Sequence, residues 1–241
     1  MGVGLVGGII LTPELTTDSC YVLYVQLIIA ISVLFKRSLL VAGFGILFLY
    51  ADAVYSYGIF HMLDYVSFVG LAIYLILSTL KLTRLEDYRL PILYLGLIFS
   101  FLWSAIEKIA YPQWFYSFLD KYEFLTLGFS NDFFIASAAF VEFTLFFLLL
   151  ITSNGVILLA FLINLLIISG NIYFGKIDAI GHFPANFILI IMLIRGPLAV
   201  QGYFFDHSCK SYTKAFNNAL VYVISLAVLF VTYYSLHWLL Y

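Results

Sequence analysis

Residues 132–151 read DFFIASAAFVEFTLFFLLLI, a stretch in which Glu142 is the only charged residue after the first. A helix rises about 1.5 Å per residue, so these twenty residues reach about 30 Å, the thickness of a bilayer's hydrocarbon core. Ser130 and Asn131 come just before, and together with Asp132 they are typical helix N-cap residues. The stretch therefore predicts a membrane-crossing helix that carries one carboxyl group at depth.

The whole chain has the composition of this stretch. Of its 241 residues, 64% are apolar and only 10% are charged, whereas a soluble domain carries about 25% charged residues. The apolar residues are numerous enough for seven or eight spans of about 20 residues each. This composition excludes a soluble catalytic domain, a nucleic-acid binder and a disordered chain. Two cysteines and a net charge of −2 indicate neither a disulfide framework nor a polyanionic partner.

Apolar runs bounded by charged or turn residues predict eight spans in an all-α, polytopic transmembrane bundle. The spans cover about residues 20–35, 38–56, 61–80, 90–110, 132–151, 156–174, 183–200 and 219–240. The longest connection, 112–131, is rich in aromatic residues that we expect at the membrane interface. Pro184 is expected in the first turn of the seventh span. A seven-span alternative lays the first run on the membrane surface.

Lysine and arginine residues fall mainly on one side of this topology. Eight belong to that side: Lys36, Arg37, Lys81, Arg84, Arg89, Arg195, Lys210 and Lys214. The opposite side has three: Lys108, Lys121 and Lys176. Because cytoplasmic loops are enriched in basic residues, we expect a protein of the cytoplasmic (inner or plasma) membrane with both termini outside the cytoplasm.

Glu142 is the deepest ionisable residue of the predicted spans. It lies about ten residues into its span, about 15 Å from the outer boundary, where an ionisable group costs about 2.5–3.5 kcal/mol on insertion scales. Asn164 and Ser100 fall at similar depth and are expected within reach of it. Two interpretations stay open: Glu142 only bridges helices through hydrogen bonds, or it contacts a proton, a substrate or a quinone.

Lys108 and Glu107 close the fourth span near its outer end. Since adjacent helical residues point in different directions, at most one of the two faces the bundle interior, and the other reaches the interface. Lys108, at the outer end of the span, is expected to interact electrostatically with any ligand that enters toward Glu142. For upright helices their depths differ by more than a side-chain length, so no direct salt bridge between Lys108 and Glu142 is predicted.

Small residues of the fifth span are expected to let helix backbones approach one another. Ala136, Ala138 and Ala139 should then face the bundle, and Phe147 should face lipid.

A second polar group is predicted in the outer third of the membrane. It consists of Asp52, His61, Asp64, Asp178 and His182. His61 and Asp64 stand three residues apart and so share a helix face. The group is either a hydrated layer of helix ends or a set of transition-metal ligands. Because no H-x-x-x-H or cysteine ligand pattern accompanies it, no metal is expected. Nucleotide-binding, haem-binding and hydrolase motifs do not occur, so a self-contained enzyme is not expected.

The segment Ser104-Ala-Ile-Glu107-Lys108-Ile109-Ala-Tyr-Pro112 resembles the G-x-x-x-K-[LF]-x-x-P signature of DoxX-like membrane proteins, with Ser104 at the glycine position. Ala138-Ala139-Phe-Val-Glu142 is similar to that family's small-residue helix with a buried glutamate, and Arg195-Gly196-Pro197 to the turn that ends its core. The resemblance covers about residues 90–197. It implies three N-terminal helices (1–89), a four-helix core (90–200), and a cytoplasmic loop with a last helix (201–241).

The resemblance also implies a function, since the family includes subunits of quinone-linked oxidoreductases and of thiol-oxidative stress complexes, as well as distant cargo receptors. We therefore expect a redox-associated membrane subunit beside a partner protein, with quinone as the one candidate cofactor. A carrier or channel for a small solute or metal ion is the first alternative, and a membrane assembly factor is the second. The lipid bilayer is an expected partner and nucleic acid is not, while the oligomeric state stays open.

Overall fold

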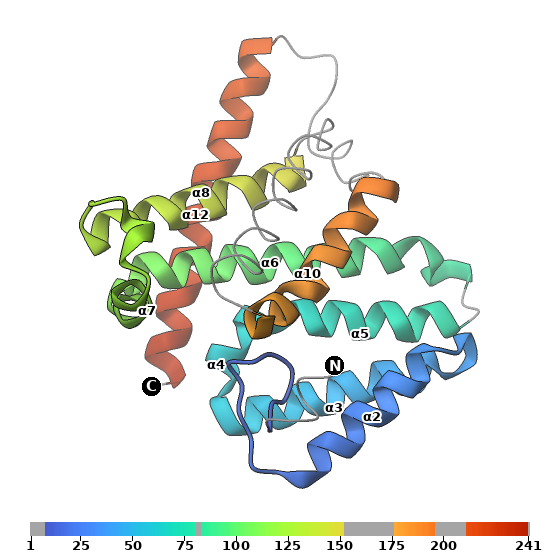
Figure 1. Ribbon diagram of the computed structural model, residues 1–241. Helices are drawn as coiled ribbons and strands as arrows, with labels where there is room; N and C mark the ends of the chain where they lie inside the picture. Colours follow the sequence, from blue (N-terminus) through green and yellow to red (C-terminus); the bar gives the residue numbers. More distant parts are fainter. Residues whose placement is uncertain (1–7, 81–82, 152–175, 196–210, 241) are drawn as a thin grey trace. The chain divides into compact units, whose positions relative to one another are not determined.

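The computed structural model describes residues 8–80, 83–151, 176–195 and 211–240 (Figure 1). These residues form helices and turns, with one isolated β-bridge between Ile9 and Thr16. The α-helices are α2 (Cys20–Val33), α3 (Leu39–Tyr57), α4 (Ile59–Met62), α5 (Val66–Thr79), α6 (Arg89–Ala110), α7 (Tyr116–Lys121), α8 (Asn131–Ile151), α10 (Lys176–Arg195) and α12 (Ser211–Leu240). The 3-10 helices are η1 (Lys36–Ser38), η2 (Leu63–Tyr65), η3 (Thr83–Tyr88), η4 (Pro112–Phe115) and η5 (Glu123–Thr126). For this part of the chain, the predicted all-α class is confirmed.

Within the described residues, five helical stretches are long and apolar enough to cross a membrane, as expected of an integral membrane protein. They are Lys36–Tyr57, Ile59–Thr79, Leu85–Ala110, Asn131–Leu150 and Ala215–Leu240. Cys20–Val33 and Gly181–Arg195 are shorter apolar helices. The predicted sixth span, 156–174, lies outside the described residues. The predicted eight crossings are therefore not confirmed.

Helix ends follow local chemistry at two positions. The Ser130 hydroxyl accepts a hydrogen bond from the Phe133 backbone N–H at 3.4 Å, which confirms the predicted N-cap of α8. Gly58 ends α3 with a φ of 85°, a backbone conformation that glycine adopts without steric cost.

The prediction for Pro184 is wrong. α10 begins at Lys176, and Pro184 lies inside the helix rather than in its first turn. The charged and polar residues ahead of Pro184 suggested a loop in the sequence, but such residue types also occur in helical turns, and the backbone is helical through them.

The chain forms two compact units, Met1–Phe99 with Asn154–Gly196 and Ser100–Ser153 with Pro197–Tyr241. In the first unit, α3 packs against both α2 and α5 (Figure 1). The core of this packing is apolar and consists of Ile10, Leu15, Val22, Ile29, Ala42, Ile46, Leu49, Ala53, Met62 and Ala72. Ile10 and Leu15 show that the segment ahead of α2 contributes to this core.

Glycines allow close helix crossings in the first unit. A Cβ atom at Gly43 of α3 would lie 2.8 Å from the backbone carbonyl oxygen of Ala72 in α5. A Cβ atom at Gly70 of α5 would lie 3.2 Å from the Cα atom of Gly96 in α6. Small residues at such crossings let backbones approach, which is how helices associate where lipid removes the hydrophobic driving force.

In the second unit, α6 and α8 run antiparallel. Phe101 stacks on Phe146 with ring centroids 4.0 Å apart, while Lys108, further along α6, meets Glu142, earlier in α8. From the first contact to the second, the residue number rises in α6 and falls in α8, as it does in antiparallel helices.

α12 packs against both helices of this antiparallel pair. Trp103 of α6 lies 5.1 Å from Tyr233 between ring centroids, and the Thr144 hydroxyl of α8 lies 3.0 Å from that of Tyr222. α12 thus adds a third helix to the packing of the second unit.

The predicted faces of α8 need two corrections. Ala139 is fully buried as expected, but Phe147 is only 2% exposed and Ala136 is exposed. Phe147 is buried because Tyr222 of α12 packs edge-on against its ring, with centroids 5.1 Å apart. Large aromatic side chains therefore form the α8–α12 contact, on a side of α8 that was expected to face lipid.

Candidate functional site

An ion pair joins the outer end of α6 to the middle of α8. The Lys108 ammonium donates to Glu142 Oε2 at 2.7 Å and to Ser104 Oγ, one turn back in α6, also at 2.7 Å. Both helices are candidate membrane spans. A charged group away from water is stabilised when it is paired and hydrogen-bonded, and Lys108 meets both conditions here.

This contact corrects the prediction that Lys108 and Glu142 form no direct salt bridge. The Cα–Cβ bonds of a helix tilt toward its N-terminus. Lys108 therefore leans back along α6, as its bond to Ser104 shows. Glu142 leans toward the start of α8, and because the two helices are antiparallel, the side chains lean toward each other. The depth estimate compared positions along the helix axes and left this tilt out.

The ion pair is partly accessible and has an aromatic neighbour. The exposed fractions of the Lys108 and Glu142 side chains are 21% and 19%. The Lys108 ammonium lies 5.5 Å from the ring centroid of Phe115, in η4, within the range of a cation–π interaction. The arrangement offers a cation, a carboxylate and a flat aromatic face to a molecule that approaches from outside the unit.

Two other residues, Ser100 and Asn164, were predicted within reach of Glu142. Ser100 is buried at 4% exposure, and Asn164 lies outside the described residues, so a contact between Asn164 and Glu142 stays a prediction. Glu107 is buried at 6% exposure, next to the partly exposed Lys108. The two residues have different surroundings, as their adjacent positions in α6 predict.

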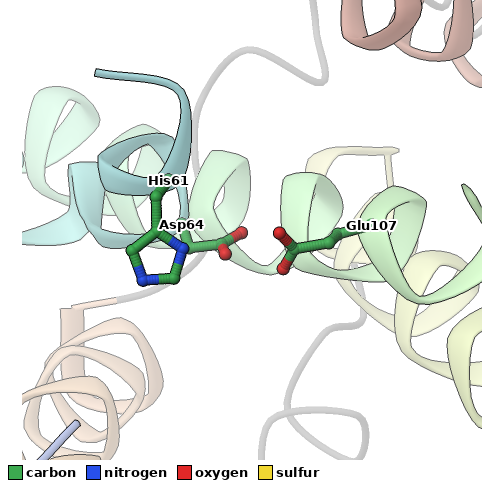
Figure 2. Close-up of side chains that lie close together, drawn as sticks. All are labelled: His61, Asp64 and Glu107. Atoms are coloured by element: carbon green, nitrogen blue, oxygen red, sulfur yellow. The ribbon is translucent and has the colours of Figure 1, made fainter. Parts of the chain in front are cut away.

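The predicted outer polar group is brought together only in part. Figure 2 shows the His61 ring and the Asp64 carboxyl group, which come from α4 and η2; their nearest ligand atoms lie within 4.8 Å of each other. Glu107, also drawn in Figure 2, belongs to α6 and to the second unit. Two ligand atoms are fewer than the three or four that a protein zinc site uses, so the His61–Asp64 pair does not by itself make a metal centre.

The remaining members of the outer group are placed separately. Asp52 of α3 accepts a hydrogen bond from the Tyr21 hydroxyl of α2 at 2.6 Å. His182 is half-buried in α10, and the Asp178 side chain lies outside the described part of α10. Asp52 thus links two helices of the first unit.

The sequence analysis missed a polar anchor for the segment before α2. The Gln26 amide donates to the carbonyl oxygens of Ile9 and Ile10 at 2.6 and 2.7 Å. The Tyr57 hydroxyl donates to the carbonyl oxygen of Thr16 at 2.7 Å, and the Tyr65 hydroxyl donates to the carboxylate of Glu14. Tyrosines near helix ends were the available signal, but nothing in the sequence spacing pairs them with this segment.

Comparisons of the chain with protein-family models, curated proteins and solved structures give no match. The geometry of the second unit is therefore the basis for a functional argument.

Proposed function

We propose that the chain is a redox-associated subunit of the cytoplasmic membrane, of the DoxX-like kind, that binds a quinone headgroup at the Lys108–Glu142 pair beside a catalytic partner protein. The observation that carries the proposal is the ion pair itself, which is partly accessible within two candidate membrane spans. The uneven distribution of basic residues supports both termini lying outside the cytoplasm, so that Lys108 is near the outer face.

The side chains present fit such a ligand. A lysine ammonium has three donor hydrogens, of which Glu142 and Ser104 accept two. The third suits a carbonyl oxygen of the ligand, and the Phe115 ring offers a face on which a planar headgroup stacks. When bound, a quinone accepts electrons and protons, and the Glu142 carboxylate stands where it can exchange a proton.

A titration of the purified full chain with a short-chain quinone such as decylubiquinone tests the proposal. All three tryptophans belong to the second unit: Trp103 and Trp238 in helices α6 and α12, and Trp114 in η4. A quinone bound at Lys108 should quench their fluorescence in a saturable way. Trp103 lies only five residues from Lys108 along the same helix, about 7.5 Å of axial rise.

Two variants and one control locate the binding site. Lys108→Met keeps the length of the side chain but removes the charge and the donors, while Glu142→Gln keeps the shape of the carboxyl group. Each should weaken quinone binding about tenfold or more, as expected for a lost charge-assisted hydrogen bond. Lys121→Met is the matched control, because Lys121 also lies over an aromatic ring, that of Tyr122 at 5.2 Å, but in α7.

The outcomes separate a ligand site from a helix-bridging contact. If the wild type shows no saturable quenching, the quinone proposal is wrong. If Lys108→Met and Glu142→Gln bind quinone like the Lys121→Met control and only lower thermal stability, the pair merely holds α6 and α8 together.

The partner part of the proposal needs a separate measurement. Purification of the chain from its own membrane in a mild detergent should yield a second protein with the visible absorption of a flavin, haem or iron–sulfur group. A chain that purifies alone, or with proteins that carry no redox group, would contradict the subunit role.

A further inference from the structure

An apolar groove runs between α2 and α3 in the first unit. Its volume is about 470 Å³, and its walls include Val25, Ile28, Leu40, Val41, Phe44 and Phe48. From Leu40 to Phe48 the helix rises about 12 Å, so the groove follows α3 for about that length.

The groove is open at the surface of the α2–α3 helix pair. The exposed fractions of Val41, Phe44 and Phe48 are 48%, 57% and 53%. On the inner side the two helices meet, where Gly45 packs against Ile29. Since Lys36–Tyr57 is a candidate membrane span, the open side of the groove faces the lipid phase.

Two cations stand at one end of this groove. Lys36 and Arg37 form η1, the turn between the helices, and both are exposed. Within the described part of the chain, neither forms an ion pair or a hydrogen bond through its side chain. The Ser38 hydroxyl donates to the carbonyl oxygens of Ser32 and Phe35 at 2.8 and 3.0 Å, which fastens the turn that carries the two charges.

We propose that α2, η1 and α3 bind an anionic phospholipid, with its phosphate between Lys36 and Arg37 and one acyl chain in the groove. Lys36 is the first residue of the candidate span, so its ammonium lies at the level of the headgroups, where basic side chains attract anionic lipids. Because neither cation is paired with any of the described residues, both favour this occupant over an apolar helix from a second copy of the chain, which would offer them no partner.

Lipid-dependent thermal stability of the full chain tests the proposal. The chain is held in uncharged detergent micelles, and phosphatidylglycerol, phosphatidylcholine or inorganic phosphate is added while far-UV circular dichroism follows unfolding. Phosphatidylglycerol should raise the unfolding midpoint in a saturable way, and the other two should not. An equal effect of phosphatidylcholine or of inorganic phosphate would overturn the proposal.

Charge variants test the headgroup contact. Lys36→Gln/Arg37→Gln should raise the phosphatidylglycerol concentration for half-maximal stabilisation by roughly thirtyfold, as expected for two lost lipid-facing charges. Arg89→Gln/Lys121→Gln removes the same net charge at two residues that do not line the groove and should leave that concentration unchanged. Equal shifts in both double variants would show a general charge effect and refute the site.

A groove variant tests the acyl-chain contact without changing charge. Val41→Trp places a large side chain on the open wall, where it does not enter the core, and should also weaken the phosphatidylglycerol effect. Tyr55→Trp is the control, at a site on the same helix that is 92% exposed. If Val41→Trp instead changes the oligomeric state by light scattering and the lipid effect persists, a second copy covers the groove and the lipid assignment is wrong.

Discussion

Breaking the Lys108–Glu142 pair should destabilise the fold by an amount that a double-mutant cycle can measure. At 2.7 Å and an effective dielectric constant of about 20, two unit charges attract by about 6 kcal/mol before desolvation. The cost of removing both charges from water offsets much of this attraction. Loss of one partner from a buried pair costs about 3–5 kcal/mol, and because a fifth of each side chain is exposed, we expect about 2–4 kcal/mol.

The cycle compares Lys108→Met, Glu142→Leu and the double variant in detergent micelles by far-UV circular dichroism. Each single variant should lower the unfolding midpoint by roughly 4–16 °C, at about 2–4 °C per kcal/mol for a chain of this size. The double variant should lose less than the sum of the singles, by about 2 kcal/mol, because neither charge is then left unpaired. The exposed Lys121→Met control should stay within about 0.5 kcal/mol of the wild type. Additive losses within about 0.5 kcal/mol would refute the coupling.

Two further predictions concern a helix crossing and a surface tyrosine. Gly43→Ala should lower stability by about 1–3 kcal/mol, since its Cβ meets the backbone of Ala72. Gly45→Ala, which meets only side-chain atoms, should lose less; a thermal melt that shows equal losses would contradict the backbone clash. In the connection after α6, the hydrogen bond to Asp132 raises the pKa of the Tyr116 phenol above its usual value of 10. The contact therefore stabilises the fold at neutral pH and is lost as the pH rises through that raised pKa. A 295 nm difference titration against Tyr116→Phe should show this, and Asp132→Asn should shift the ionisation of Tyr116 to lower pH; an unchanged titration would speak against the bond.

The features that follow from local chemistry were predictable from the sequence. Continuous apolar runs set the helical class, and the hydroxyl of Ser130 caps α8 as its residue type predicts. Glu142 stood out because a carboxyl group at that depth needs a partner. These inferences depend on one segment at a time, so the arrangement of the other helices did not affect them.

The features that depend on how helices face one another were not predictable. Lys108 reaches Glu142 because the two side chains tilt toward each other on antiparallel helices. The depth of each residue along its helix axis, which is what the sequence gives, does not include this tilt. Phe147 is buried because α12 packs on that face of α8, and the sequence does not say which helix does so. The contacts of the segment before α2 with Tyr57 and Tyr65 were not predictable either, since these tyrosines lie 41 and 51 residues further along the chain.

The docking of that first segment sets an order of events during synthesis. Thr16 is separated from Tyr57 by 41 residues and Glu14 from Tyr65 by 51. At about 5–20 residues per second, the ribosome needs roughly 3–10 s to add the 51 residues between Glu14 and Tyr65. The segment is therefore synthesised some seconds before its tyrosine partners exist. Its hydrogen bonds to Gln26 can form as soon as α2 is made, whereas the contact with Tyr65 can form only once the second candidate span, Ile59–Thr79, has been started.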